Sequence, residues 1–136
     1  LYAWGANDKG QLGIGSNTGT VTPVRVTLAS PAKAARGGKA HSVVLLANGT
    51  VVAFGSNQDG QLGDTTRVDR LVPVTMTGVT AASAIATGAT FSIAGAANGA
   101  VLACGDNTSG QLGDGTSTRR PTPVLVTGVT TLAQPG

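Results

Sequence analysis

The chain has 136 residues, a formal net charge of +3 and 11% charged residues. This length suits one ordinary domain, and the mildly basic balance (pI about 9.6) permits an acidic partner without requiring one. The single cysteine excludes an internal disulfide and a thiolate metal cluster. Gly, Thr and Val are abundant while helix formers and aromatic residues are scarce, so we expect strands and turns closely packed through small side chains.

A tetrapeptide, Gly-Gln-Leu-Gly, returns every 50 residues and organises the chain. A period of this size is typical of solenoids and propellers. We interpret each tetrapeptide as a structural corner and not as a ligand site, because it serves the repeat and not one place. We expect its Leu to turn inward and its Gln to bond nearby backbone, while an Asn three residues upstream closes an Asx-turn. The corner residues are Gly10, Gln11, Leu12, Gly13, Gly60, Gln61, Leu62, Gly63, Gly110, Gln111, Leu112 and Gly113.

Short strands are predicted immediately before each corner. Residues 1–5, 51–55 and 101–105 correspond to one another at this spacing. In the second copy an upstream strand over 40–46 is joined to 51–55 through Asn48-Gly49, a strong hairpin signal that Asn98-Gly99 repeats. The run from 43 to 46 is apolar on both faces, which predicts a strand covered on both sides, as in stacked sheets.

Polar excursions follow the corners, over 16–22, 65–71 and 115–122. A Pro-Val pair then opens a further strand of the type 74–77, in which Pro at the first position loses no ladder hydrogen bond. Another short strand is expected over 82–86. Four strands in each 50-residue unit correspond to one propeller blade.

One set of motifs resembles the repeat of the regulator of chromosome condensation family. The motifs are His41-Ser42, Asn48-Gly49, Phe54-Gly55-Ser56-Asn57, Gly60-Gln61-Leu62-Gly63 and Pro73-Val74, and the resemblance covers essentially the whole chain. It implies an all-β fold of β-propeller blades, each of four antiparallel strands, forming part of what resembles a seven-bladed propeller. Cys104 departs from the family pattern where an aromatic is expected, and Phe91 where His is expected.

We divide the single repeat region, 1–136, into an incomplete repeat over 1–36 and two further repeats over 37–86 and 87–136. The region is expected to be a fragment of a longer propeller, or to be completed by other copies, because an open blade face would be largely apolar.

No catalytic, cofactor or metal site is predicted. His41, the only histidine, has no repeat-related partner and is expected to be structural, and Cys104 replaces core residues and is expected to be buried and inert. The glycines over 10–15 are not followed by a helix or a Lys-Ser/Thr pair, so we reject a phosphate loop. The acids are interpreted as turn residues, because the alternating Asp/Asn pattern of a calcium loop is missing. They are Asp8, Asp59, Asp64, Asp69, Asp106 and Asp114.

Arg67, Arg70, Arg119 and Arg120 fall in equivalent excursions and are the best candidates for a partner-binding rim. An ordinary solvated loop is the alternative. No aromatic residues accompany these arginines, so stacking of single-stranded nucleic acid is not expected.

These patterns favour a non-enzymatic protein-interaction or structural module that binds through its rim loops. The resemblance implies one alternative, guanine-nucleotide exchange on a small GTPase, although the unbroken spacing leaves no room for an inserted wedge. A subunit of an extracellular surface assembly is the other alternative. We expect a protein partner, either an acidic surface or further copies of the chain, with no specific nucleic acid, no membrane span and no cofactor. The composition alone favours the exterior of a bacterium.

Overall fold

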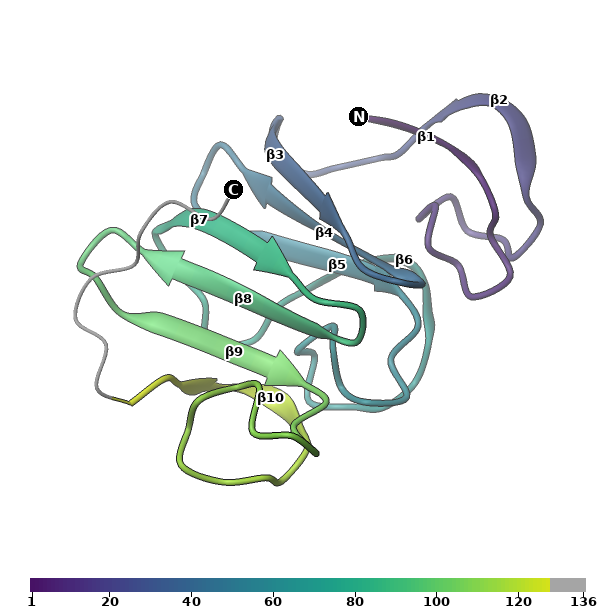
Figure 1. Ribbon diagram of the computed structural model, residues 1–136. Coiled ribbons are helices and arrows are strands. Elements are labelled where there is room, and N and C mark those ends of the chain that lie inside the picture. The colour runs from purple at the N-terminus through teal and green to yellow at the C-terminus, as the bar shows by residue number, and fades with distance from the viewer. Residues whose placement is uncertain (128–136) are drawn as a thin grey trace.

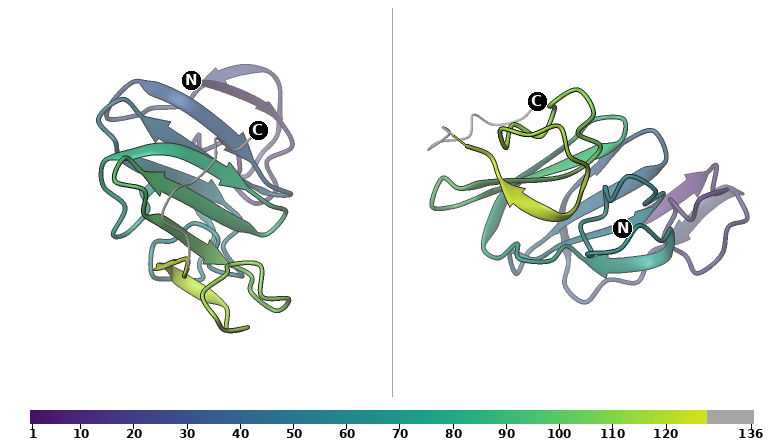
Figure 2. Two further views of the ribbon diagram at one scale, coloured as in Figure 1. Left: turned by 60° about the vertical axis from the view of Figure 1, so that its left-hand side comes forward. Right: turned by 90° about the horizontal axis from the view of Figure 1, so that it is seen from below.

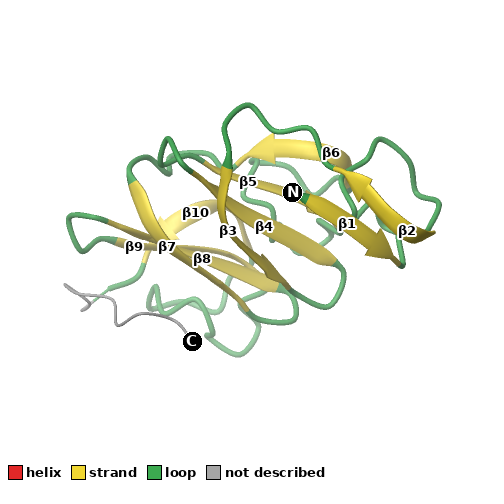
Figure 3. Cartoon of the chain, turned by 90° about the horizontal axis from the view of Figure 1, so that it is seen from above, coloured by secondary structure: helices red, strands yellow, loops and turns green. Residues whose placement is uncertain are grey.

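A computed structural model describes residues 1–127, and within that range the chain forms ten strands and no helix (Figures 1 and 3). A two-stranded first sheet pairs β1 (Tyr2–Gly5) with β2 (Thr20–Arg25). The second sheet contains β3 (Ala32–Gly37), β4 (His41–Leu46), β5 (Val51–Gly55) and β6 (Arg70–Thr75). The third sheet contains β7 (Ala82–Thr87), β8 (Phe91–Ala96), β9 (Val101–Gly105) and β10 (Arg120–Leu125). All pairs are antiparallel, which confirms the predicted all-β class and the four-stranded blades.

The three sheets lie side by side in chain order, with the second between the other two (Figure 2). Within each four-stranded sheet every strand pairs with its neighbour in sequence, so each sheet is a simple meander. In the part of the chain that the structure describes, no helix is long and apolar enough to cross a membrane.

Strand β4 contributes side chains to both of the apolar clusters that join the sheets. Its side chains alternate between two apolar clusters, as the two-residue period of a strand requires. Val43 and Leu45 belong to the cluster shared with the third sheet, while Val44 and Leu46 belong to the cluster shared with the first. All four are at most 2% exposed, so the prediction of a strand covered on both faces is confirmed. Full burial of such a side chain contributes about 1.5–3 kcal/mol.

The Asn48-Gly49 hairpin is also confirmed. Asn48 Oδ1 accepts a hydrogen bond from the Thr50 backbone N–H at 3.0 Å, and Gly49 adopts φ +84°, a conformation that favours glycine. The carbonyl of Gly49 then accepts from the Ala82 N–H at 2.9 Å. The hairpin tip therefore anchors the segment that leads into the third sheet.

The prediction that Pro73 opens its strand is wrong. Strand β6 begins at Arg70, which pairs with Gly55, and Pro73 is its fourth residue. The register shifts before Val74 pairs with Ala53, so Pro73 lies in an irregular stretch of an edge strand. Its missing N–H removes no ladder bond there, which is the same physical reason applied at a different position.

The predicted strand over 82–86 forms as β7, but it pairs with β8 in the third sheet and not with the strands that precede it. The sheets are therefore offset from the expected 50-residue units: the last strand of one unit is the first strand of the next sheet. The expected boundaries at 37 and 87 coincide with the last residues of β3 and β7.

Candidate interaction rim

The corners are built as the sequence indicates. Leu12, Leu62 and Leu112 are 5%, 0% and 1% exposed, so each seals its loop onto the core. In every copy the Gln side-chain oxygen accepts a hydrogen bond from the backbone N–H two residues upstream, at 2.9, 3.0 and 2.8 Å. Both expectations for this motif are confirmed.

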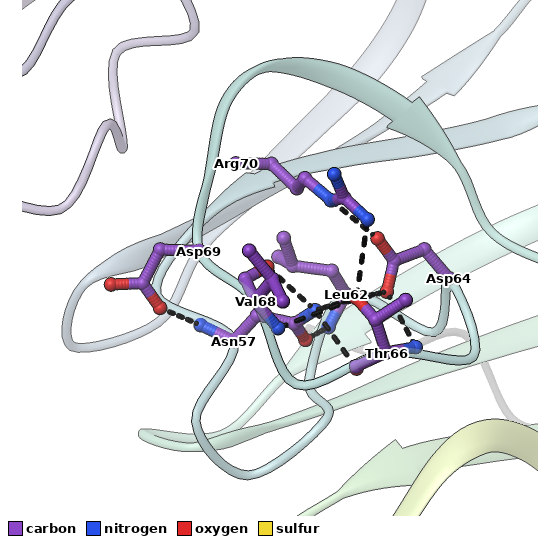
Figure 4. Close-up of polar contacts among 7 residues, drawn as sticks. All are labelled: Asn57, Leu62, Asp64, Thr66, Val68, Asp69 and Arg70. Atoms are coloured by element: carbon purple, nitrogen blue, oxygen red, sulfur yellow. Dashed lines mark hydrogen bonds and ion pairs between the residues drawn. The ribbon is translucent and has the colours of Figure 1, made fainter.

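The Asx-turn predicted for the upstream asparagine does not form, because the backbone N–H two residues further on donates to the Gln side chain instead. The asparagine makes longer-range bonds. Asn57 is fully buried, and its Oδ1 accepts from the Leu62 N–H at 3.0 Å. Its Nδ2 donates to the carbonyls of Thr66 and Val68, each at 3.0 Å (Figure 4). One side chain thus holds the corner and the excursion together across eleven residues. Asn7 and Asn107 make the equivalent bonds in the other copies.

A carboxylate completes this network in the second sheet. Asp64 Oδ1 accepts from the side chain of Asn57 at 2.9 Å and from both the N–H and hydroxyl of Thr66, at 3.0 and 2.8 Å. Arg70 Nε pairs with Asp64 Oδ2 at 2.7 Å (Figure 4). The third sheet repeats the arrangement with Asn107, Asp114, Thr116 and Arg120.

These hydrogen bonds control the ionisation of both carboxylates. Burial acts to raise the pKa of Asp64, but the bonds from Thr66, Arg70 and Asn57 outweigh it and hold the pKa below its usual value. The pKa of Asp114 is strongly lowered, chiefly by the hydrogen bond from the Thr116 hydroxyl. Both loops therefore contain a fixed negative charge that holds an arginine in place.

The structure brings the four predicted arginines to adjacent loops, between β5 and β6 and between β9 and β10 (Figure 1). We call these loops, residues 56–69 and 106–119, the rim. Arg70 and Arg120 begin the strands that follow them and are held by their own Asp partners. Arg119 Nε lies 2.9 Å from Asp59 Oδ1 of the neighbouring loop, as a charge pair without a hydrogen bond. Arg67 donates instead to the Gln58 carbonyl.

A polar cluster lies beneath the rim, between the second and third sheets. Ser92 donates its hydroxyl to the Gln61 carbonyl at 2.6 Å, so the His41 Nε2–H, 3.0 Å away, donates to Ser92. His41 is 1% exposed, and burial lowers its pKa to about 4 against an opposing contribution from the Phe91 backbone. The Cys104 thiol lies 3.6 Å from the same Gln61 carbonyl, and burial raises its pKa to about 12. The burial expected for Cys104 is confirmed, and His41 begins β4, which is the strand start expected for it.

This cluster holds two sheets together and is unsuited to catalysis. The Ser92 hydroxyl is committed to a main-chain carbonyl, and the thiol of Cys104 stays protonated at neutral pH. Ser42 in the second sheet makes the equivalent bond to the Gln11 carbonyl of the first, at 2.8 Å. Serine therefore links each four-stranded sheet to the corner of the sheet before it.

A cleft of about 450 Å³ separates the first and second sheets. Among the described residues that line it, Arg25 is the only ionisable side chain, and the others include Ile14, Leu28, Val52 and Val72. Within residues 1–127 no group of three His, Cys, Asp or Glu side chains is placed to hold a metal ion. The cleft can accept an apolar side chain, but its lining has no acid–base pair.

A signal in the sequence could have revealed the Asp–Arg pairs. Asp and Arg occur six residues apart in the second and third copies, while the first copy has Ile14 and Thr20 at the same positions. Both members of the pair are thus present together or replaced together. Joint presence is what a direct contact requires.

The family model described as "Regulator of chromosome condensation (RCC1) repeat" matches residues 1–45, 48–94 and 98–133. The chain belongs to this family. Its three consecutive RCC1 repeats agree with the three sheets and confirm the resemblance drawn from the motifs. No curated protein matches the chain.

Solved structures share the RCC1 fold. Prp20p from Saccharomyces cerevisiae, whose structure was described together with its binding to Gsp1p and histones, matches with a TM-score of 0.83 at 21% identity, over 93% of this chain and 34% of that one. Yeast RCC1 (Prp20) with bound Kap60 gives 0.82 at 22%, over 93% and 32%. Human WBSCR16 gives 0.79 at 24%, over 91% and 34%. The chain spans about a third of the length of these structures, and at such identities the likeness concerns the fold.

Proposed function

We propose that this chain is a non-enzymatic protein-interaction module that binds a protein partner through the rim. The observation that carries the proposal is the network centred on Asn57 and repeated at Asn107. It fixes the loop backbone from inside, so the outward side chains are free to differ between repeats. Loops of variable sequence on a rigid frame are the usual way in which scaffolds acquire binding specificity.

Arg67 and Val68 form the part of the rim best suited to a partner. Val68 is 58% exposed, and Arg67 has no carboxylate partner among residues 1–127. Arginine beside an exposed apolar side chain is a favourable combination at protein interfaces, because the guanidinium can pair a carboxylate in a bidentate manner. Arg70, Arg119 and Arg120 keep roughly a third of their side-chain surface exposed, and they lie in the rim loops or begin the strands that follow them.

The absence of enzymatic activity is part of the same proposal. It is supported by the burial of His41 and Cys104, which are the only histidine and the only cysteine in the sequence. Location outside a bacterial cell is likewise a proposal, supported by composition alone.

A capture experiment tests the proposal. Immobilised wild-type chain, an R67A/V68A variant and an R36A control are exposed to extract of the source organism at low and high salt. Arg36 is a suitable control because it belongs to β3, outside the rim loops, and its guanidinium bonds to the neighbouring Ala35 carbonyl. We expect a protein retained by the wild type and the control at low salt and lost by R67A/V68A. Identical captured proteins on all three would refute binding through the rim.

Guanine-nucleotide exchange on a small GTPase is the second candidate, favoured by the similarity to Prp20p, whose binding to Gsp1p is recorded. The assay is release of labelled GDP from Gsp1p and from a panel of other small GTPases. Accelerated release that R67A/V68A abolishes would favour exchange over passive binding. Unchanged release across the panel would eliminate this candidate.

A further inference from the structure

A pocket of about 230 Å³ lies at the start of the rim loop that connects β5 to β6. Ser56, Asp59 and Gln61 of this loop line it. Lys9, which precedes the corner of the first sheet, and Lys39 of the β3–β4 turn complete its polar lining together with residues of the β7–β8 turn. All three sheets therefore contribute to one small concave site.

Main-chain hydrogen bonds fix the walls of this pocket. The Lys39 N–H donates to the Ala89 carbonyl at 2.9 Å and so joins the β3–β4 turn to the β7–β8 turn. The Ser56 N–H donates to the Ala40 carbonyl, also at 2.9 Å. A site whose backbone is fixed before binding loses less conformational entropy when a ligand arrives.

Gln61 gives the pocket a buried donor with a weak partner. The residue is 2% exposed. Its Oε1 accepts from the Asp59 N–H at 3.0 Å, and this bond identifies Nε2 as the other end of the amide. Nε2 lies 3.5 Å from Ser56 Oγ, beyond the usual range of about 2.7–3.2 Å. A buried donor held so loosely is costly, so a ligand that brings a better acceptor is favoured.

The first corner indicates which acceptor suits this donor. There the equivalent Gln11 Nε2 donates to the Asp8 carboxylate at 3.1 Å. In the second copy the position of Asp8 is taken by Gln58, which has no negative charge. A carboxylate supplied from outside would restore the bond, and an ionised acceptor makes a stronger bond than a neutral one.

The charges of the lining favour an occupant with a single negative charge. Lys9 and Lys39 form no ion pair with any residue in the described range, 1–127. Asp59 pairs with Arg119 at 2.9 Å. The lining residues thus comprise two cations and one anion, a net charge of +1. Asp59 would repel a dianion such as phosphate more strongly than it would repel a carboxylate.

We propose that this pocket binds the carboxylate of an aspartate or glutamate side chain of the protein partner. Gln61 Nε2 donates to one carboxylate oxygen, and Lys9 and Lys39 neutralise the charge. The pocket is smaller than the range of about 300–1,000 Å³ usual for small-molecule sites, which favours a single side chain as the occupant. This inference rests on the proposed function, because the pocket belongs to the rim, and it names the chemistry that the partner presents there.

The test is a titration at pH 7 in which NMR follows the side-chain amide signal of Gln61. The probes are a blocked pentapeptide with one glutamate among glycines and its glutamine counterpart. We expect the glutamate peptide to shift the signal to saturation and the glutamine peptide to leave it in place. K9A/K39A should weaken binding of the glutamate peptide about tenfold or more. K33A, a change on β3 outside the pocket lining, should leave it unaltered.

A second variant supplies the acceptor from the chain itself. Ser56→Asp copies Asp106, the residue at the equivalent position of the third copy, and should abolish binding of the glutamate peptide by placing a carboxylate beside Gln61. No shift with the glutamate peptide, equal shifts with both peptides, or binding that K9A/K39A leaves intact would overturn the inference. Tighter binding of inorganic phosphate than of the glutamate peptide would overturn it as well.

The capture experiment separates this inference from the proposed function. A partner that R67A/V68A loses and K9A/K39A retains at full strength would overturn the pocket assignment and leave binding through the rim in place. A partner that both variants lose while R36A and K33A retain it is the expected result.

Discussion

The asparagine that organises each loop gives the sharpest mutational prediction. In Asn57→Ala the buried Leu62 N–H loses its acceptor, and the carbonyls of Thr66 and Val68 lose their donor. An unsatisfied buried polar group costs about 1–3 kcal/mol. The Leu62 N–H is fully buried while the carbonyls lie nearer the surface, where water can replace the lost donor. The expected loss of unfolding free energy is therefore about 2–4 kcal/mol, a large fraction of the stability of a small domain.

The isosteric variant Asn57→Asp refines this test. It keeps the acceptor for Leu62 but directs a carboxylate at two carbonyls and at Asp64, whose Oδ1 is 2.9 Å from Asn57 Nδ2. It should be at least as destabilising as the alanine variant at pH 7, and less so in acid, where the new carboxyl is protonated. Urea unfolding followed by circular dichroism measures both, with the exposed turn residue Asn48→Ala as the control. Loss in Asn57→Ala no greater than in the control would refute the role assigned to this side chain.

Three further predictions concern single residues. Burial lowers the pKa of His41 to about 4 from an ordinary 6.5, so as the pH falls the unfolded chain takes up a proton before the folded chain does. The free energy of unfolding should therefore drop by about 3 kcal/mol between pH 6.5 and 4. Urea unfolding should show that His41→Phe largely lacks this loss. Thr65 has φ +73° where the other copies have glycine, so Thr65→Gly should stabilise the fold by about 1 kcal/mol. Thr66→Gly should destabilise it, because the hydroxyl that donates to Asp64 is lost. Thermal unfolding that ranks the two variants the other way would contradict this. Cys104 should react with a thiol reagent about a hundredfold more slowly in buffer than in urea, and equal rates would show that it is not buried.

Residues that act locally were the most predictable from the sequence. The inward Leu of each corner, the Asn48-Gly49 turn and the doubly covered run over 43–46 each follow from a short pattern with one physical meaning. The 50-residue period then made the blades predictable, because equally spaced copies contact their neighbours in the same way.

Residues whose roles depend on distant partners were harder to predict. Asn57 binds carbonyls nine and eleven residues away, and nothing in its local sequence indicates this reach. The local sequence predicts Pro73 at a strand start, because the register shift that accommodates it within β6 depends on β5, which is distant in the sequence. The sequence places four arginines in equivalent excursions as candidates for a rim, but the pairing of Arg70 with a carboxylate in its own loop became visible only in the structure.

The central claim is that short sheets are joined by one contact repeated between neighbours, and amide hydrogen exchange tests it most directly. The Gly15 and Thr65 N–H groups lie in loops, yet each donates across to the next sheet, whereas the Gly115 N–H has no such partner among residues 1–127. In a dilute, monomeric sample we predict that Gly15 and Thr65 exchange as slowly as strand amides and that Gly115 exchanges fast. Equal, rapid exchange at all three positions would contradict the account.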